Sequence, residues 1–245
     1  GIESKIFFPQ FHAREHLNVS LFMDALKRRD PDVLFGFENQ MPGSISRSNG
    51  TNYNYYIGST GYISLPDKEE KLTIYLEGLD LFESIFGYKS ESIIPTNYVW
   101  SIDYNKAIYE KGVSYIQGIR KICEPIQGNK NKYHRVYLGK KNTLGQVYLV
   151  RNAFFEPSLF NYKIRNPVEQ CLSEIEIAFK MRKPAVITSH RINYVGFIDE
   201  ANRDRTLGML NKLLVSIYKK WPDVVFMNTV QLGKMINRSS QELLH

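Results

Sequence analysis

Short apolar segments with strand character alternate with amphipathic helical patterns along most of this chain of 245 residues. Strands that alternate with helices are typical of parallel sheets whose strands are joined by right-handed crossovers. The segments expected to form strands are 7–11, 33–37, 92–94, 113–117, 184–188 and 224–227, with a hairpin at 133–138 and 146–150. The expected helices cover 17–29, 67–86, 105–111, 166–179, 202–220 and 229–237. This order predicts an α/β fold that closes into a barrel.

Polar side chains stand directly after several of the expected strands. They are His12, His16, Asn97, Tyr98, Arg151, Asn152, His190 and Arg191. In (β/α) barrels the carboxyl ends of the strands carry the active site. We therefore expect these residues, which come from four separate segments, to meet around one mouth of the barrel.

The sharpest chemical signal is a pair of histidines four positions apart, His12 and His16, where an apolar run gives way to a helical pattern. Side chains at positions i and i+4 of a helical turn lie on one face, so both imidazoles could reach a single cation. A catalytic zinc normally has three protein ligands and an open position for water, so a third ligand has to come from elsewhere. The alternative is a pair at the end of a strand that hydrogen-bonds to the backbone.

Composition and charge bound the class of protein. Hydrophobic residues make up 43% of the chain and charged residues 23%, as in an ordinary globular domain, and no apolar run reaches the ~20 residues that span a membrane. The formal net charge of +7 could attract nucleic acid, but the basic residues stand in short groups interleaved with acids. We therefore expect a single domain over residues 1–245 with no nucleic-acid partner and no membrane span. The compartment stays open, with a soluble cytoplasmic protein favoured.

The segment 39–66 is rich in Gly, Ser, Asn and Tyr, which predicts a long loop. Its tyrosines, Tyr53, Tyr55, Tyr56 and Tyr62, could stack on sugar rings or pack on the scaffold of the loop itself. We expect this loop to close over the mouth and to bring tyrosines to the ligand.

Three stretches together resemble the polysaccharide deacetylases of carbohydrate esterase family four. They are the strand followed by His12-x-x-x-His16, the run Pro95-Thr96-Asn97-Tyr98 before a helix and a strand, and Ala185-Val186-Ile187-Thr188-Ser189-His190 before a long helix. The resemblance implies a distorted seven-stranded (β/α) barrel and a metal-dependent hydrolase that removes acetyl groups from an N-acetylated sugar or polysaccharide. It also implies that His12 and His16 bind a divalent metal, usually zinc, that Pro95 to Tyr98 line the substrate groove, and that His190 is the general acid.

The chain departs from this family at the first motif, an Asp-Asp pair that precedes the histidines and supplies the catalytic base and the third metal ligand. Only Glu3 stands upstream of the histidines. We therefore expect the sequence to be the C-terminal part of a longer chain, with the first strand of the barrel missing from it. The alternative is that the acids are absent and that the protein is a catalytically inactive, glycan-binding relative. The sequence also has Ile93-Ile94 where the family has an arginine before the groove motif, and Ala13 where it has Ser or Thr.

Further polar residues are candidates for the same mouth. We expect Asn97, Tyr98, Arg151 and Arg191 to contact substrate, together with Asn193, Asn202 and Arg203 from the last loop. Arg151 could orient a carboxylate or bind an acidic sugar, and Glu156 could be a local acid, with an ordinary surface salt bridge as the alternative for each. His190 could instead bond to a neighbouring loop, and we interpret His134, inside an expected hairpin strand, as structural.

Overall fold

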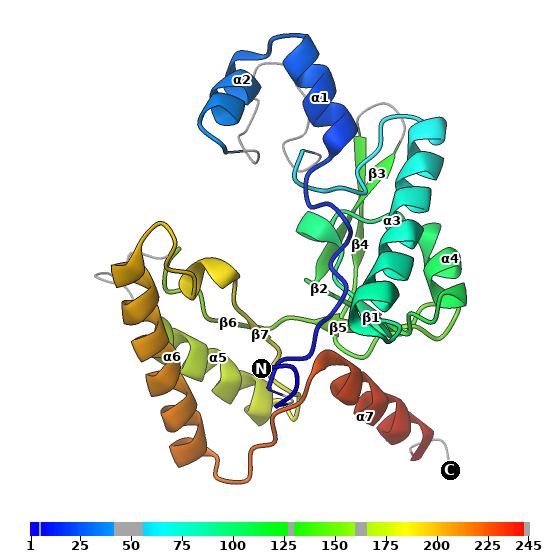
Figure 1. The fold of residues 1–245 in the computed structure, drawn as a ribbon. Helices are drawn as coiled ribbons and strands as arrows, with labels where there is room; N and C mark the ends of the chain where they lie inside the picture. Colours follow the sequence, from blue (N-terminus) through cyan, green and yellow to red (C-terminus); the bar gives the residue numbers. More distant parts are fainter. Residues whose placement is uncertain (5, 42–55, 127–129, 160–165, 243–245) are drawn as a thin grey trace. The chain divides into compact units, whose positions relative to one another are not determined.

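The computed structural model describes residues 1–4, 6–41, 56–126, 130–159 and 166–242 of the chain (Figure 1). They cluster into two compact units, the first made of Gly1–Leu149 with Asn228–His245 and the second of Val150–Met227. The expectation of a single domain over residues 1–245 stays a prediction beside this division. Among the helices within the described ranges, none combines the length and the apolar character needed to cross a lipid bilayer.

The chain is α/β, but the predicted seven-stranded (β/α) barrel is wrong for the described residues, because their strands form three small sheets and none of these closes. The first sheet has the strand order β1 (Ser92–Ile93), β2 (Tyr115–Gly118) and β5 (Val147–Val150). In the second sheet β3 (Lys121–Ile126) pairs antiparallel with β4 (Lys130–Arg135). In the third sheet β6 (Ala153–Phe154) pairs parallel with β7 (Ile187–Thr188). A barrel needs an unbroken ring of hydrogen-bonded neighbours. Short strands divided among separate sheets do not provide one.

Several expected strands are absent for identifiable reasons. Residues 33–37 lie in helix α2 (Pro31–Glu38), because the Asp30 side chain accepts two backbone N–H groups of the first turn and a proline starts the helix. In the segment 7–11 only Phe11 pairs, through an isolated parallel bridge to Ile93. Residues 224–227 have no strand pairing. The two strands of the expected hairpin do not pair with each other, because β4 pairs with β3 and β5 lies in the sheet of β1 and β2.

The first unit holds the helices α1 (Val19–Lys27), α2, α3 (Leu65–Phe86), α4 (Tyr104–Glu110) and α7 (Thr229–Glu242) and the 3-10 turn η2 (Thr96–Tyr98). Helix α3 begins two residues before the expected position, because Ser64 caps it by accepting the backbone N–H of Asp67 at 3.3 Å. It ends at Gly87, whose φ of 74° suits a residue without a side chain.

The core of the first unit is built from aromatic side chains. The rings of Phe11 and Tyr75 have centroids 5.0 Å apart, and Trp100 lies 5.1 Å from Tyr75 and 5.3 Å from Tyr104, all edge to face. Edge-to-face contacts between buried rings add to the free energy gained from burial alone. The segment that follows Phe11 is therefore anchored to helix α3 and to the loop that starts at Trp100.

The structure describes two of the four tyrosines of the expected loop, and both belong to the core. Tyr56 and Tyr62 are buried, and the Tyr62 hydroxyl donates to the carbonyl of Pro125 at 2.6 Å. These two side chains pack on their own scaffold and are not available to stack on a sugar. Tyr53 and Tyr55 lie outside the described residues, so the predicted lid stays a prediction.

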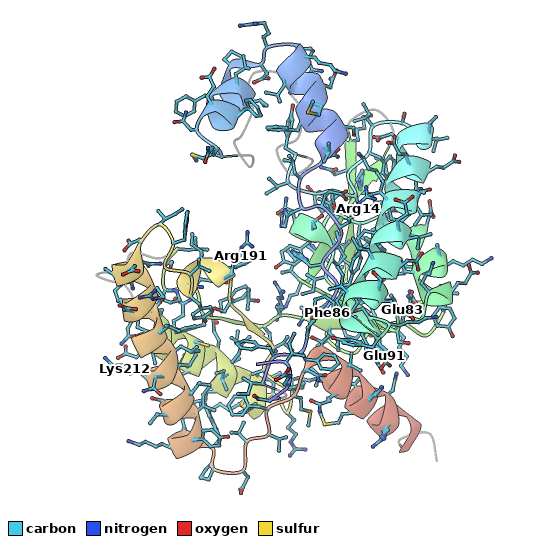
Figure 2. All side chains as sticks on the ribbon, in the orientation of Figure 1. Arg14, Glu83, Phe86, Glu91, Arg191 and Lys212 are labelled. Atoms are coloured by element: carbon cyan, nitrogen blue, oxygen red, sulfur yellow. The ribbon has the colours of Figure 1, made fainter. Side chains whose placement is uncertain are left out.

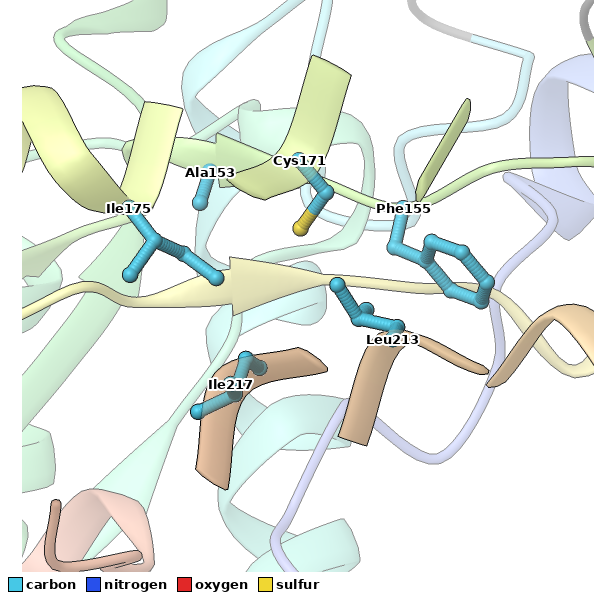
Figure 3. Close-up of a cluster of buried hydrophobic side chains, with 6 residues drawn as sticks. All are labelled: Ala153, Phe155, Cys171, Ile175, Leu213 and Ile217. Carbon is cyan, nitrogen blue, oxygen red and sulfur yellow. The ribbon is translucent and has the colours of Figure 1, made fainter. Parts of the chain in front are cut away.

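The second unit packs helix α5 (Pro167–Lys180) against helix α6 (Glu200–Lys220) beside β6 and β7 (Figure 1). Its apolar core consists of Ala153, Phe155, Cys171, Ile175, Leu213 and Ile217, as shown in Figure 3. Each fully buried Leu or Ile side chain contributes about 1.5–3 kcal/mol relative to an exposed one. This core holds the ends of β6 and β7, and the two segments that follow these strands carry the candidate site.

Candidate functional site

The parallel pairing of β6 and β7 brings two distant polar segments together. Ala153 pairs with Ile187 and Phe154 with Thr188, and the backbone N–H of Phe155 donates to the carbonyl of Thr188 at 2.8 Å. Because parallel strands end at the same edge, the segments 155–158 and 189–193 leave the sheet side by side. The Asn152 side chain secures this arrangement by accepting the N–H of Val186 at 2.7 Å.

A buried carboxylate holds an exposed imidazole at this edge. The Nδ1 atom of His190 lies 2.6 Å from Oε1 of Glu156. The Glu156 side chain is 5% exposed and the His190 side chain 58% exposed. A carboxylate can only accept from an imidazole N–H here, so Nδ1 carries a proton and Nε2 is the ring nitrogen that faces away from Glu156. The surface salt bridge considered for Glu156 is excluded by its burial.

Residue Asn193 is fully buried, so it does not contact substrate as expected from the sequence. Its side-chain amide lies beneath the Glu156–His190 pair and donates to Oε2 of Glu156 at 2.9 Å. The last turn of the segment, the 3-10 helix η3 (Arg191–Asn193), carries this side chain into the unit.

Ser189 is not available as a nucleophile beside His190. Its hydroxyl donates to the carbonyl of Phe155 at 2.7 Å, so the Tyr194 hydroxyl, 2.6 Å away, donates to Ser189 Oγ. Burial raises the pKa of Tyr194, and the negative charge of Glu156 raises it further, whereas the bond to Ser189 opposes the shift. Tyr194 therefore stays a neutral hydrogen-bond donor at physiological pH.

The two arginines predicted to contact substrate both belong to the second unit. Arg191 is exposed on η3, and Figure 2 shows its side chain directed away from α6. Arg151 is half-buried and follows β5. Both predictions concern contact with a ligand and stay predictions. Asn202 holds the loop instead, since its side chain accepts the Ser158 hydroxyl at 3.0 Å and donates to the carbonyl of Ile192 at 3.1 Å.

In the first unit His12 and His16 do come together, although no helical turn links them. Both lie in the irregular segment before α1, and Ala13 between them has a φ of 79°. Their ring centroids are 5.3 Å apart at an interplanar angle of 71°. Gly78 of α3 allows the close approach of this segment, since a Cβ there would lie 2.8 Å from the Phe11 ring.

The geometry of the two histidines suits a shared cation in part. With Zn–N bonds of about 2.0–2.1 Å and tetrahedral angles, two imidazole ligands of one ion have ring centroids roughly 5 Å apart. Nδ1 of His12 donates to the carbonyl of Ile94 at 2.7 Å, and metal-binding histidines commonly make an outer contact of this kind. Within the part of the chain that the structure describes, no group of three or more His, Cys, Asp or Glu residues could hold a metal. The described residues thus supply two ligands of the three that a catalytic zinc needs.

The segment that carries Asn97 and Tyr98 follows the same sheet edge as His12. Phe11 bridges Ile93 in parallel, so His12 and Ile94 leave that edge together, and Asn97 comes three residues later. Asn97 and Tyr98 both have left-handed backbone conformations, with φ of 49° and 55°. Consecutive left-handed residues other than glycine are uncommon and occur most often at functional sites.

A second carboxylate–histidine pair lies in the first unit. Nε2 of His134 on β4 is 2.5 Å from Oε2 of Glu124 on β3, and the other oxygen accepts from the Ser101 hydroxyl and from the Ile102 N–H. The His134 side chain is 23% exposed, so it is less accessible than His190. Its partner Glu124 lies on the same hairpin and is held by the loop at 101–102, which agrees with the structural role expected for His134.

No protein-family model matches this chain, and no curated protein sequence matches it either. The sequence pattern does not reveal the roles of Asn193 and Glu124. Asn193 stands three positions after His190, but nothing local shows that it reaches a carboxylate 37 residues earlier.

Proposed function

We propose that this protein is a hydrolase of C–N amide bonds that removes acetyl groups from an N-acetylated sugar or polysaccharide. In this proposal His190 is the general acid and Glu156 is the residue that orients it. The observation that carries the proposal is the hydrogen bond between a buried Glu156 carboxylate and an exposed His190 imidazole, at 2.6 Å. An imidazole fixed at one nitrogen and accessible at the other is the arrangement that general acid–base catalysis needs.

The reaction requires a proton at the leaving nitrogen. Water adds to the acetyl carbon, the C–N bond breaks, and the nitrogen takes up a proton, which yields acetate and a free amine. The water gives up both of its protons, of which one restores protonated His190 and the other goes to solvent. Protonated His190 donates from Nε2, because Nδ1 is held by Glu156. After the transfer the neutral ring keeps its proton on Nδ1, the tautomer that the carboxylate favours.

A divalent metal belongs to the same proposal. His12 and His16 would hold it, and when bound it would supply a Lewis acid for the acetyl carbonyl and the attacking water. The resemblance to the deacetylases places Asn97 and Tyr98 at the substrate, and Arg151 and Arg191 are the proposed cationic contacts of the sugar.

The test is acetate release from chito-oligosaccharides by the purified protein in its full natural length, with added zinc. General acid catalysis contributes about 10²–10⁴-fold, so His190→Gln should lower kcat by at least about 100-fold. His134→Gln is a matched control, because it removes an imidazole of the same kind paired with the Glu124 carboxylate. It should leave kcat within about twofold of the wild-type value.

Two results would contradict the hydrolase. One is an equal loss of activity in the His190 and His134 variants. The other is a zinc-supplied protein that binds chito-oligosaccharides and releases no acetate, which would favour the non-catalytic, glycan-binding alternative. Metal analysis of His12→Ala tests the metal separately, since this change should abolish zinc binding.

A further inference from the structure

We propose that Asn193 is a positioning residue, which fixes the Glu156 carboxylate so that one of its oxygens stays on Nδ1 of His190. This inference rests on the proposed function of His190. It concerns a residue that contacts neither water nor substrate, since Asn193 is fully buried.

The two carboxylate oxygens of Glu156 have different hydrogen-bond partners. Oε1 faces Nδ1 of His190 at 2.6 Å, and Oε2 accepts the backbone N–H of His190 at 3.2 Å and Nδ2 of Asn193 at 2.9 Å. The backbone contact is the longest of the three. Without the amide, the carboxylate could rotate about its last bond and lose the aligned oxygen, because terminal sp²–sp³ torsions are broad.

The amide of Asn193 is itself fixed at both ends. Oδ1 accepts the backbone N–H of Ser158 at 2.9 Å, and Nδ2 also donates to the carbonyl of His190 at 2.9 Å. Its backbone carbonyl accepts the hydroxyl of Thr206 on α6. These contacts fix which amide atom faces Glu156, because turning the amide over would leave the Ser158 N–H facing an NH₂ group.

Asn193 therefore joins the segments 155–158 and 189–193, which are both needed for the Glu156–His190 pair. Removal of its donor leaves the buried Glu156 carboxylate with one hydrogen bond fewer. The loss should lower the rate of the step that needs this carboxylate aligned with His190. We expect Asn193→Ala to lower kcat by about 10- to 100-fold, the value of a hydrogen bond to a charged group, with KM nearly unchanged.

A spectroscopic measurement separates positioning from general stability. ¹⁵N shifts of the His190 ring report which nitrogen carries the proton in the neutral form. Wild-type protein should show the Nδ1–H tautomer, and Asn193→Ala should show an increased share of Nε2–H. Ser158→Ala is the matched control, because it breaks the Ser158–Asn202 contact of the same loop and leaves the Ser158 N–H on Asn193. Its tautomer and kcat should match those of the wild-type protein.

A double-mutant cycle tests whether Asn193 acts through Glu156. In a Glu156→Gln background, the further change Asn193→Ala should cause no further loss of kcat, since residues that act as a unit are not additive and the aligned carboxylate is already absent. If the Ala variant does not fold, Asn193→Leu takes its place, because Leu has the same number of side-chain heavy atoms and the same branching without donors. Wild-type protein gives a third measurement, a scalar coupling across the hydrogen bond from Asn193 Nδ2 to the Glu156 carboxyl carbon.

The outcomes distinguish this inference from the proposed function. A protein without deacetylase activity whose His190 tautomer still depends on Asn193 would overturn the function and support the inference. An active enzyme whose His190 tautomer and kcat are unchanged in Asn193→Ala, or that lacks the scalar coupling, would overturn the inference. Equal effects of Asn193→Ala and Ser158→Ala would also overturn it, because they indicate general loosening of the loop.

Discussion

The substitution Glu156→Gln keeps the shape of the side chain and replaces one oxygen by an NH₂ group. That group can face Nδ1 of His190, or it can face the two donors at the Oε2 position, the His190 N–H and the Asn193 amide. The second choice sets one donor against two and leaves buried N–H groups unpaired, at about 1–3 kcal/mol each. The NH₂ group should therefore face Nδ1 of His190. Nδ1 must then accept a hydrogen bond and cannot carry a proton.

The expected result is a change of tautomer with little change of fold. Neutral His190 should carry its proton on Nε2, and the doubly protonated ring should be disfavoured because its Nδ1–H would face another donor. Loss of the charged hydrogen bond alone, about 1.5–3 kcal/mol, corresponds to roughly 10- to 150-fold in kcat. The corresponding carboxylate-to-amide change in a Ser-His-Asp triad costs about 10⁴-fold through the wrong tautomer. We expect kcat to fall between these limits.

The assay combines ¹⁵N spectroscopy of the His190 ring with the rate of acetate release. Glu124→Gln, the same change at the pair with His134, is the control and should leave both measurements at the His190 site unchanged. A Glu156→Gln variant that retains the Nδ1–H tautomer would refute the hydrogen-bond reasoning, whether or not activity is detected.

Two further predictions concern packing and pH. A Cβ at Gly233 of α7 would overlap the Tyr115 ring, so Gly233→Ala should lower the melting temperature, whereas Gly208→Ala in α6 meets nothing within 4 Å and should raise helix stability by up to about 1 kcal/mol. Equal melting temperatures for these two variants would contradict the packing described for Tyr115. Burial raises the pKa of the Cys171 thiol to about 12, so thiol reagents should label it at pH 8 only after unfolding. Because the folded pKa lies above the reference value of 9.0, the contribution of this thiol to stability is complete below about pH 9 and declines as the pH rises toward 12. Rapid labelling of the native protein at pH 8 would show that Cys171 is accessible.

The sequence by itself determined the elements whose signals are local. Helix α5 begins where Asn166 caps it and a proline occupies its first position, and its apolar residues recur on one face, as expected. Helices α3 and α6 were likewise predicted close to their observed bounds. Neighbours within four residues determine such helices, so the sequence contains the relevant interactions. The proximity of His12 and His16 was also predicted, although an irregular segment and not a helical turn produces it.

Only the tertiary structure decided how the strands pair and where the polar side chains are buried. The helical state of the run 33–37 is an exception, because capping by Asp30 is a local signal that the expected strand did not take into account. The expected barrel failed because short strands paired within separate small sheets, and strand pairing depends on partners far away in the sequence. The sequence left Glu156 as either a local acid or a partner in a surface salt bridge. Glu156 becomes the partner of His190 because the parallel ladder of β6 and β7 joins segments 34 residues apart, and because Asn193 is buried beneath both.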